Sequence, residues 1–210
     1  MLTERFDAAL LFAAALHKSQ TRKGGQIPYL SHLLAVAALV LEDGGSEDEA
    51  IAGLLHDSIE DQGSIYPGGR AALRDYIRDE FGVAVAHIVK ECTDDEGFEK
   101  HSVIPSAEQR ELWWERKRKY AKEIAHKTPP ALRVTAADKV HNAESILDSH
   151  AAVGPKVWNR FRTKSRQDQI DVYRDLSAAI TARNNGLGDN QRSALPKRLV
   201  RAVLLMEQLA

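Results

Sequence analysis

The stretch AIAGLLHDSIED, residues 50–61, joins an apolar helical pattern to a group of ionisable side chains. Apolar residues recur at helical spacing along it: Ile51, Leu54, Leu55 and Ile59. Just before it, Ser46 and Glu49 have the spacing of a capping box, which marks the start of a helix. We therefore expect one helix over about residues 47–61.

Four polar side chains lie on one strip of this expected helix. Residues four apart share a helical face, so His56 would stand over Glu60 and Asp57 over Asp61. Taken alone, this strip is equally well explained as an exposed polar edge with helical charge pairing.

The same periodicity extends over almost the whole chain, with breaks at glycine and proline. We expect further helices over about residues 6–16, 28–42, 73–81, 85–89, 106–127, 129–150 and 156–183, and a last amphipathic one around residues 195–204. Residues 93–104 read as a loop. The sequence has no convincing strand pattern and no internal repeat, so the predicted fold class is all-α.

Composition excludes several classes of protein. In 210 residues, 29 basic and 30 acidic side chains give a net charge of −1, which argues against a general nucleic-acid binder. The single cysteine, Cys92, excludes a disulfide framework and a cysteine-based zinc module within one chain, and favours a reducing compartment. The longest apolar run, Leu33 to Leu41, is too short to span a bilayer, and the N-terminus has no signal-peptide pattern. We expect a cytoplasmic protein of one domain.

Three segments together offer donors for a metal ion. His32 lies in the apolar second helix, His56 and Asp57 in the quoted stretch, and Asp138 near the middle of the sequence AADKVHN, residues 136–142. Two imidazoles and two carboxylates suit a borderline divalent ion such as manganese, iron or zinc. Facing helices of a bundle commonly build metal sites in this way. Taken alone, His32 is better explained as a buried histidine and Asp138 as part of an exposed helical face.

The ordered set of these motifs resembles a known family. Arg22-Lys23, Pro28-Tyr29 with His32, His56-Asp57 with Glu60-Asp61, and Ala137-Asp138-Lys139 with Asn142 resemble the HD phosphohydrolase superfamily. More closely, they are similar to the hydrolase domain of RelA/SpoT-type proteins and its stand-alone form, the small alarmone hydrolases of the Mesh1-like group. The resemblance covers about residues 5–180.

The resemblance implies a single HD-domain bundle of about eight to ten helices over residues 1–183, with residues 184–210 as a C-terminal helix on the same domain. It implies hydrolysis of (p)ppGpp to GDP or GTP plus pyrophosphate, usually with manganese, and a role in the stringent response. The metal ligands carry over to His32, His56, Asp57 and Asp138, and the catalytic residues to Glu60, Asp61 and Asn142. Substrate contacts carry over to Arg22, Lys23, Thr93, Lys139 and Arg166.

Two alternatives stay open at this level. The same site could act on another nucleotide, such as (p)ppApp or the 2′-phosphate of NADPH, because the base-contacting residues are not apparent. The chain could instead be a metal-bound regulatory module, although Glu60, Asp61 and Asn142 disfavour a site without turnover. The expected partner is a small nucleotide, not a nucleic acid or a membrane. The apolar face of the last helix fits either a homo-oligomer contact or packing on its own domain.

Overall fold

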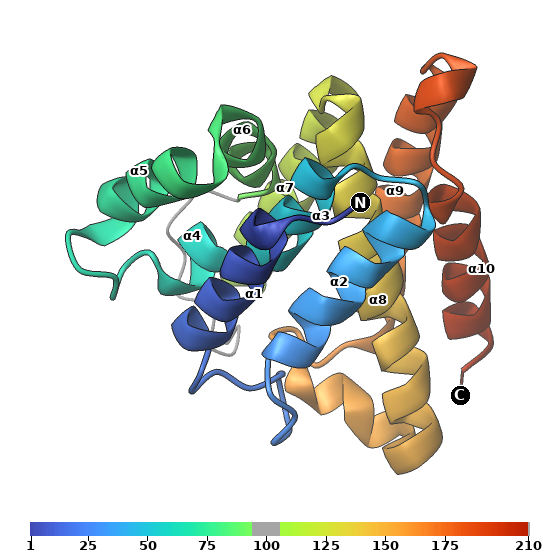
Figure 1. Ribbon diagram of the computed structural model, residues 1–210. Coiled ribbons are helices and arrows are strands. Elements are labelled where there is room, and N and C mark those ends of the chain that lie inside the picture. The colour runs from blue at the N-terminus through green and yellow to red at the C-terminus, as the bar shows by residue number, and fades with distance from the viewer. Residues whose placement is uncertain (94–105, 210) are drawn as a thin grey trace. The chain divides into compact units, whose positions relative to one another are not determined.

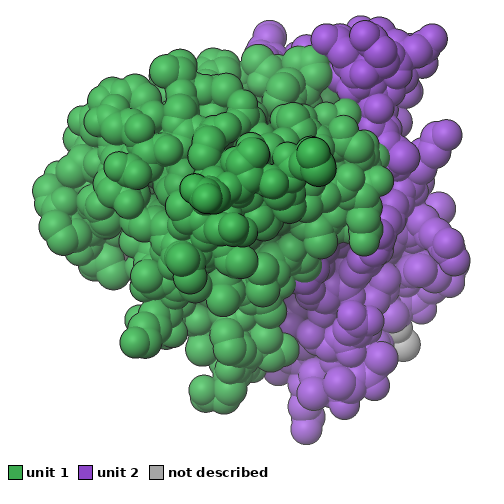
Figure 2. Space-filling view, viewed as in Figure 1, with its two compact units in different colours: residues 1–95, 128–138 green, residues 96–127, 139–210 purple. Residues whose placement is uncertain are grey.

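The computed structural model of the protein describes residues 1–93 and 106–209 (Figure 1). Helices make up its regular structure, and the described residues contain no strand, only an isolated bridge between Thr21 and Pro28. The all-α prediction is confirmed. The chain forms two compact units, residues 1–95 with 128–138 and residues 96–127 with 139–210 (Figure 2). No helix in the described ranges is long and apolar enough to cross a membrane.

The first unit is a bundle centred on α3. Its helices are α1 (Glu4–Leu16), α2 (Leu30–Glu42), α3 (Glu47–Leu55), α4 (Ser58–Gln62), α5 (Gly69–Phe81), α6 (Val83–Cys92) and the first turns of α8 (Pro129–Val153). Helix α3 packs against α1, α2 and α6. Large apolar side chains fill this core: Leu33, Ile51, Leu54, Leu55, Leu73, Ile77 and Leu132.

Helices α2 and α3 approach each other closely at Gly53. A Cβ atom at this position would lie 3.2 Å from Cα of Ala37, tighter than an ordinary van der Waals contact. The absence of a side chain at Gly53 thus lets the two helices that carry the histidines pack backbone to backbone.

The second unit packs α9 against α7 and α10. It contains α7 (Ala107–Glu123), η1 (Ile124–His126), the remainder of α8, η2 (Gly154–Arg160), α9 (Arg166–Asn185), η3 (Asp189–Gln191) and α10 (Leu195–Gln208). The apolar face of α10, with Leu199, Val203 and Met206, is buried. Helix α10 packs against α9 in the same unit.

The expected single helix over residues 47–61 is wrong, because it is broken in the middle. Helix α3 ends at Leu55, α4 begins at Ser58, and His56 and Asp57 form the junction. The imidazole Nδ1 of His56 makes a 2.8 Å hydrogen bond with the carbonyl oxygen of Gly53. A side chain thus binds a carbonyl group that a backbone N–H would bind in a continuing helix. Asp57 still accepts the backbone bond from Asp61, at 2.9 Å, so these two residues keep their helical relation.

The expected helix over residues 156–183 begins later than predicted. Residues Gly154–Arg160 form a 3-10 helix, and α9 starts only at Arg166. Lys164 has a left-handed φ of 50°, and the Ser165 hydroxyl caps the new helix by accepting from the backbone N–H of Asp168 at 3.1 Å. The loop expected over residues 93–104 lies outside the described residues, apart from Thr93.

Candidate metal centre

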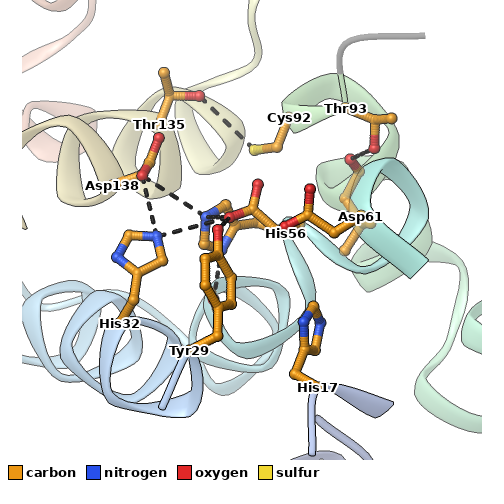
Figure 3. A network of polar contacts seen from close by, with 12 residues as sticks. His17, Tyr29, His32, His56, Asp61, Cys92, Thr93, Thr135 and Asp138 are labelled. Atoms are coloured by element: carbon orange, nitrogen blue, oxygen red, sulfur yellow. Dashed lines mark hydrogen bonds and ion pairs between the residues drawn. The ribbon is translucent and has the colours of Figure 1, made fainter. Parts of the chain in front are cut away.

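Three separate elements of the first unit bring four donor side chains together (Figure 3). His32 lies on α2, His56 and Asp57 lie at the junction of α3 and α4, and Asp138 lies on α8. Both imidazoles are buried, with residue exposures of 0% and 3%, whereas the carboxylates are slightly more open. The break between α3 and α4 allows two adjacent residues, His56 and Asp57, to face the same point.

The donor atoms converge within a few ångströms. Nε2 of His32 lies 3.3 Å from Oδ1 of Asp138 and 3.7 Å from Oδ2 of Asp57. Nε2 of His56 lies 3.1 Å from Oδ2 of Asp57 and 3.8 Å from Oδ1 of Asp138. Ligand atoms of His32, His56 and Asp57 all lie within 4.8 Å of one another, as a metal-binding group requires.

The orientation of His56 is fixed from behind. Its Nδ1 donates to the carbonyl oxygen of Gly53 at 2.8 Å, so in the neutral imidazole the proton resides on Nδ1 and the lone pair of Nε2 points to the cluster. A histidine that binds a metal commonly has its second nitrogen held in this manner, which selects the tautomer.

Tyr29 holds one of the carboxylates. Its hydroxyl donates a short hydrogen bond to Oδ2 of Asp57. Burial and the neighbouring carboxylate of Asp57 raise the pKa of Tyr29 well above its ordinary value, so the hydroxyl keeps its proton and stays a donor. The Tyr29 ring also contacts His32 edge-on, with ring centroids 5.4 Å apart.

The charges of the cluster support one another in the metal-free protein. Burial lowers the pKa of His56, but the carboxylates of Asp57 and Asp138 outweigh it, and the pKa ends well above its ordinary value. Burial likewise raises the pKa of Asp57, but His56 and His32 outweigh it, and the pKa ends well below its ordinary value. The two carboxylates thus favour positive charge at this cluster, which a bound cation would also supply.

The donor set matches a divalent ion. Two imidazole nitrogens and two carboxylate oxygens are ligands that manganese, iron and zinc accept. The carboxylates neutralise the charge of the ion, and the fixed Nε2 of His56 requires no rearrangement to bind it. This arrangement is therefore a candidate site for a divalent metal ion.

Two further carboxylates follow the junction on α4. Asp61 accepts a hydrogen bond at Oδ2 from the side-chain amide of Gln20, at 2.7 Å, and Figure 3 places Asp61 beside the cluster. Glu60 is half-buried on the same helix. These carboxylates lie one helical turn beyond His56 and Asp57, and carboxylates are side chains that can transfer protons.

The predicted nucleotide contacts Arg22 and Lys23 lie in the turn between α1 and α2. The Arg22 guanidinium lies over the Tyr29 ring, with its central carbon 5.7 Å from the ring centroid. Lys23 is exposed in the tight turn that follows, where Gly24 has a left-handed φ of 78°. The Tyr29 side chain therefore contacts both Arg22 and the donor Asp57.

The other predicted contacts have different surroundings. Thr93 ends α6, and its hydroxyl donates to the carbonyl oxygen of Val89 at 2.8 Å, which is a capping role. Lys139 and Asn142 lie on α8 in the second unit, and the Lys139 ammonium lies 5.3 Å from the centroid of the Tyr120 ring. Arg166 begins α9 in that unit and donates to the carbonyl oxygen of Glu207 at 2.7 Å. Substrate contact by Thr93, Lys139 and Arg166 and the catalytic role of Asn142 stay predictions.

Sequence reasoning gave no role to three side chains around the cluster. Tyr29 was part of the pattern that carried the resemblance, and only its distance of three residues from His32 hinted at a contact. His17 and Gln20 lie at the end of α1 and just beyond it, and their link to Asp61 spans more than forty residues. No local pattern encodes such a contact.

The fold and the donor set together define an all-α protein with a buried cluster of histidines and aspartates that could hold a divalent metal ion. The model of the family described as "HD domain" matches residues 9–179, so the chain belongs to the HD domain family.

Several curated relatives share most of the chain. It is 34% identical over 166 residues to the guanosine-3′,5′-bis(diphosphate) 3′-pyrophosphohydrolase MESH1 of Xenopus tropicalis, covering 75% of this chain and 79% of that one. It is 30% identical to the human protein of the same name, covering 73% of each. A solved structure described as "A metazoan ortholog of SpoT hydrolyzes ppGpp and plays a role in starvation responses" has a TM-score of 0.71 over 100% of this chain and 99% of that one, at 21% identity. That likeness shows the shared fold.

Proposed function

We propose that the protein is a manganese-dependent hydrolase that converts (p)ppGpp to GDP or GTP and pyrophosphate. The observation that carries the proposal is the convergence of His32, His56, Asp57 and Asp138 on one point, with Asp61 held one turn away. The MESH1 relatives match across most of their length, and the activity in their name identifies the proposed substrate.

The reaction adds water to the phosphorus attached to the 3′-oxygen and breaks the bond between them. When bound, a divalent ion supplies a Lewis acid for a phosphoryl oxygen and activates water for attack. The chain must still accept the proton of the attacking water and deliver one to the leaving 3′-oxygen. Asp61 and Glu60 are the candidates for these two transfers.

Asp61 is the better acceptor of the pair. Its Oδ2 accepts an amide N–H from Gln20, which fixes the orientation of the carboxylate. This leaves Oδ1 to accept from water and leaves proton delivery to Glu60. Asn142 is proposed to orient substrate or water.

Arg22 and Lys23 are proposed to hold the nucleotide. The planar guanidinium of Arg22 suits stacking on a base or bidentate binding of phosphate, and Lys23 provides an exposed point charge in the same turn. Lys139, Thr93 and Arg166 are proposed as further substrate contacts, and residues 184–210 as an extension of the HD domain.

Product analysis tests the proposal. Manganese-loaded protein is incubated separately with ppGpp, ppApp and NADPH, with Asp57→Ala as the control. The proposal predicts release of GDP and pyrophosphate from ppGpp by the native protein and none by Asp57→Ala. Turnover of ppApp or NADPH alone would overturn the guanosine assignment, and turnover by Asp57→Ala would overturn the metal site as its source.

A further inference from the structure

A chain of side-chain hydrogen bonds ends at Asp61. Nε2 of Gln20 lies 2.7 Å from Oδ2 of Asp61, Oε1 of Gln20 lies 2.7 Å from Nδ1 of His17, and Nε2 of Gln62 lies 2.5 Å from the same Oε1. The segments that meet here are the end of α1, the turn after it and α4. His17 and Asp61 both point into this region in Figure 3.

The chemistry of the partners gives the chain one direction. The Gln20 group that faces Asp61 is the side-chain NH₂, which donates to the carboxylate oxygen. The Gln20 oxygen must then accept from both of its neighbours, Gln62 and His17. His17 therefore carries its proton on Nδ1, and every bond in the chain donates toward Asp61.

His17 is a rigid anchor for this chain. The residue is 2% exposed, and its ring stacks on Tyr29 with centroids 5.4 Å apart and an interplanar angle of 19°. Burial lowers the pKa of His17 despite the nearby Gln20 and Asp61, which agrees with the neutral, Nδ1-protonated ring. Because Tyr29 also binds Asp57, the same histidine is linked to the metal donors on one side and to Asp61 on the other.

We propose that Gln20, anchored by His17 and Gln62, is a positioning residue that fixes the carboxylate of Asp61 for proton transfer. This inference rests on the proposed hydrolase function, and it assigns a role to residues outside the metal ligands and the acidic pair. Among the described residues, the side-chain hydrogen bonds of Gln20 join it to Asp61, His17 and Gln62, and it acts through the orientation of Asp61.

Gln20→Glu is the sharpest test, because the new side chain has the same shape. It keeps an oxygen for His17 and Gln62 but places a second carboxylate oxygen against Asp61, which removes the donor and adds repulsion. Misplacing a reacting group by about 1 Å can cost about 100-fold in rate, so we expect kcat to fall about 10- to 100-fold. KM for ppGpp and the affinity for Mn²⁺ are expected to be unchanged.

Two further variants separate positioning from general damage. Gln20→Met has similar length without donor or charge, so kcat should fall, but by less than in Gln20→Glu. Gln169→Glu makes the same chemical change at a glutamine in α9 that is 7% exposed, and it should leave kcat unchanged. Native kcat in both Gln20 variants would overturn the proposal, as would loss of Mn²⁺ binding in parallel with kcat.

A crystal structure of the manganese form of Gln20→Glu provides a readout that needs no substrate. The proposal predicts that the Asp61 carboxylate turns away from residue 20 while the four metal donors keep their positions. An Asp61 that stays in place would overturn it. If the native protein fails to hydrolyse ppGpp, the proposed function is wrong. The crystal structure of Gln20→Glu still tests whether Gln20 orients Asp61.

Discussion

The Tyr29→Phe substitution removes one hydrogen bond from the metal site and little else. The phenylalanine ring keeps the shape that stacks on His17 and meets the edge of His32, so the packing around the cluster is preserved. Only the hydroxyl that donates to Oδ2 of Asp57 is lost. That oxygen is also the one that lies 3.1 Å from Nε2 of His56, so its position matters for any ion bound between them.

The size of the effect follows from the kind of bond. A hydrogen bond to a charged group contributes about 1.5–3 kcal/mol, and every 1.4 kcal/mol is about tenfold in affinity. Loss of a partner that orients a metal ligand usually costs about 10- to 100-fold in metal affinity. We therefore expect Tyr29→Phe to weaken Mn²⁺ binding by about 10- to 100-fold.

Electron paramagnetic resonance of free Mn²⁺ during a titration measures this affinity directly. Tyr76→Phe is the matched control, because Tyr76 packs against Phe12 and Phe81 in the same unit and is not part of the cluster. Its affinity for Mn²⁺ should equal that of the native protein. An unchanged affinity in Tyr29→Phe would refute the orienting role of the hydroxyl.

Three other predictions concern stability and pH. Arg133→Met leaves the buried carboxylates of Asp43 and Glu49 without their shared cation, so the free energy of unfolding in urea should fall by about 3–5 kcal/mol, and a loss under about 1 kcal/mol would contradict this. Because neighbouring carboxylates raise the pKa of His56 and a metal ion binds only the neutral imidazole, Mn²⁺ affinity should increase with pH, by about tenfold per pH unit below that pKa; titrations that give the same affinity at each pH would oppose this. Gly53→Val forces a side chain between α2 and α3, and a drop of about 1–3 kcal/mol in thermal or urea stability is expected, with native stability as the contrary result.

Helical periodicity was enough to place most of the fold. The stripes of α1, α2 and α10 and the capping box of Ser46 and Glu49 predict their helices directly, and the capping box forms as expected. The sequence did not reveal the break after Leu55, because helical spacing is nearly preserved across His56 and Asp57. What ends α3 is a side chain bonding back to Gly53, and a periodicity argument does not include such a contact.

The candidate metal donors could be predicted from the sequence for a different reason. Histidine and aspartate in an ordered set resemble a family pattern, so His32 and Asp138 could be joined although 106 positions separate their numbers in the chain. Gln20 and His17 are not distinguished by residue type. Their proposed role depends on two hydrogen bonds of 2.7 Å, one between His17 and Gln20 and one between Gln20 and Asp61. Positions set by long-range packing of this kind require the folded structure.

The central claim is that the cluster of His32, His56, Asp57 and Asp138 is the centre at which ppGpp is hydrolysed. Its most direct test is to titrate metal-free protein with Mn²⁺ while measuring pyrophosphate release from ppGpp. The account predicts no release without the ion and a rate that rises in proportion to Mn²⁺ bound until the site is full, whereas Asp57→Ala stays inactive throughout. Release that is independent of bound Mn²⁺, or equal in Asp57→Ala, would contradict it.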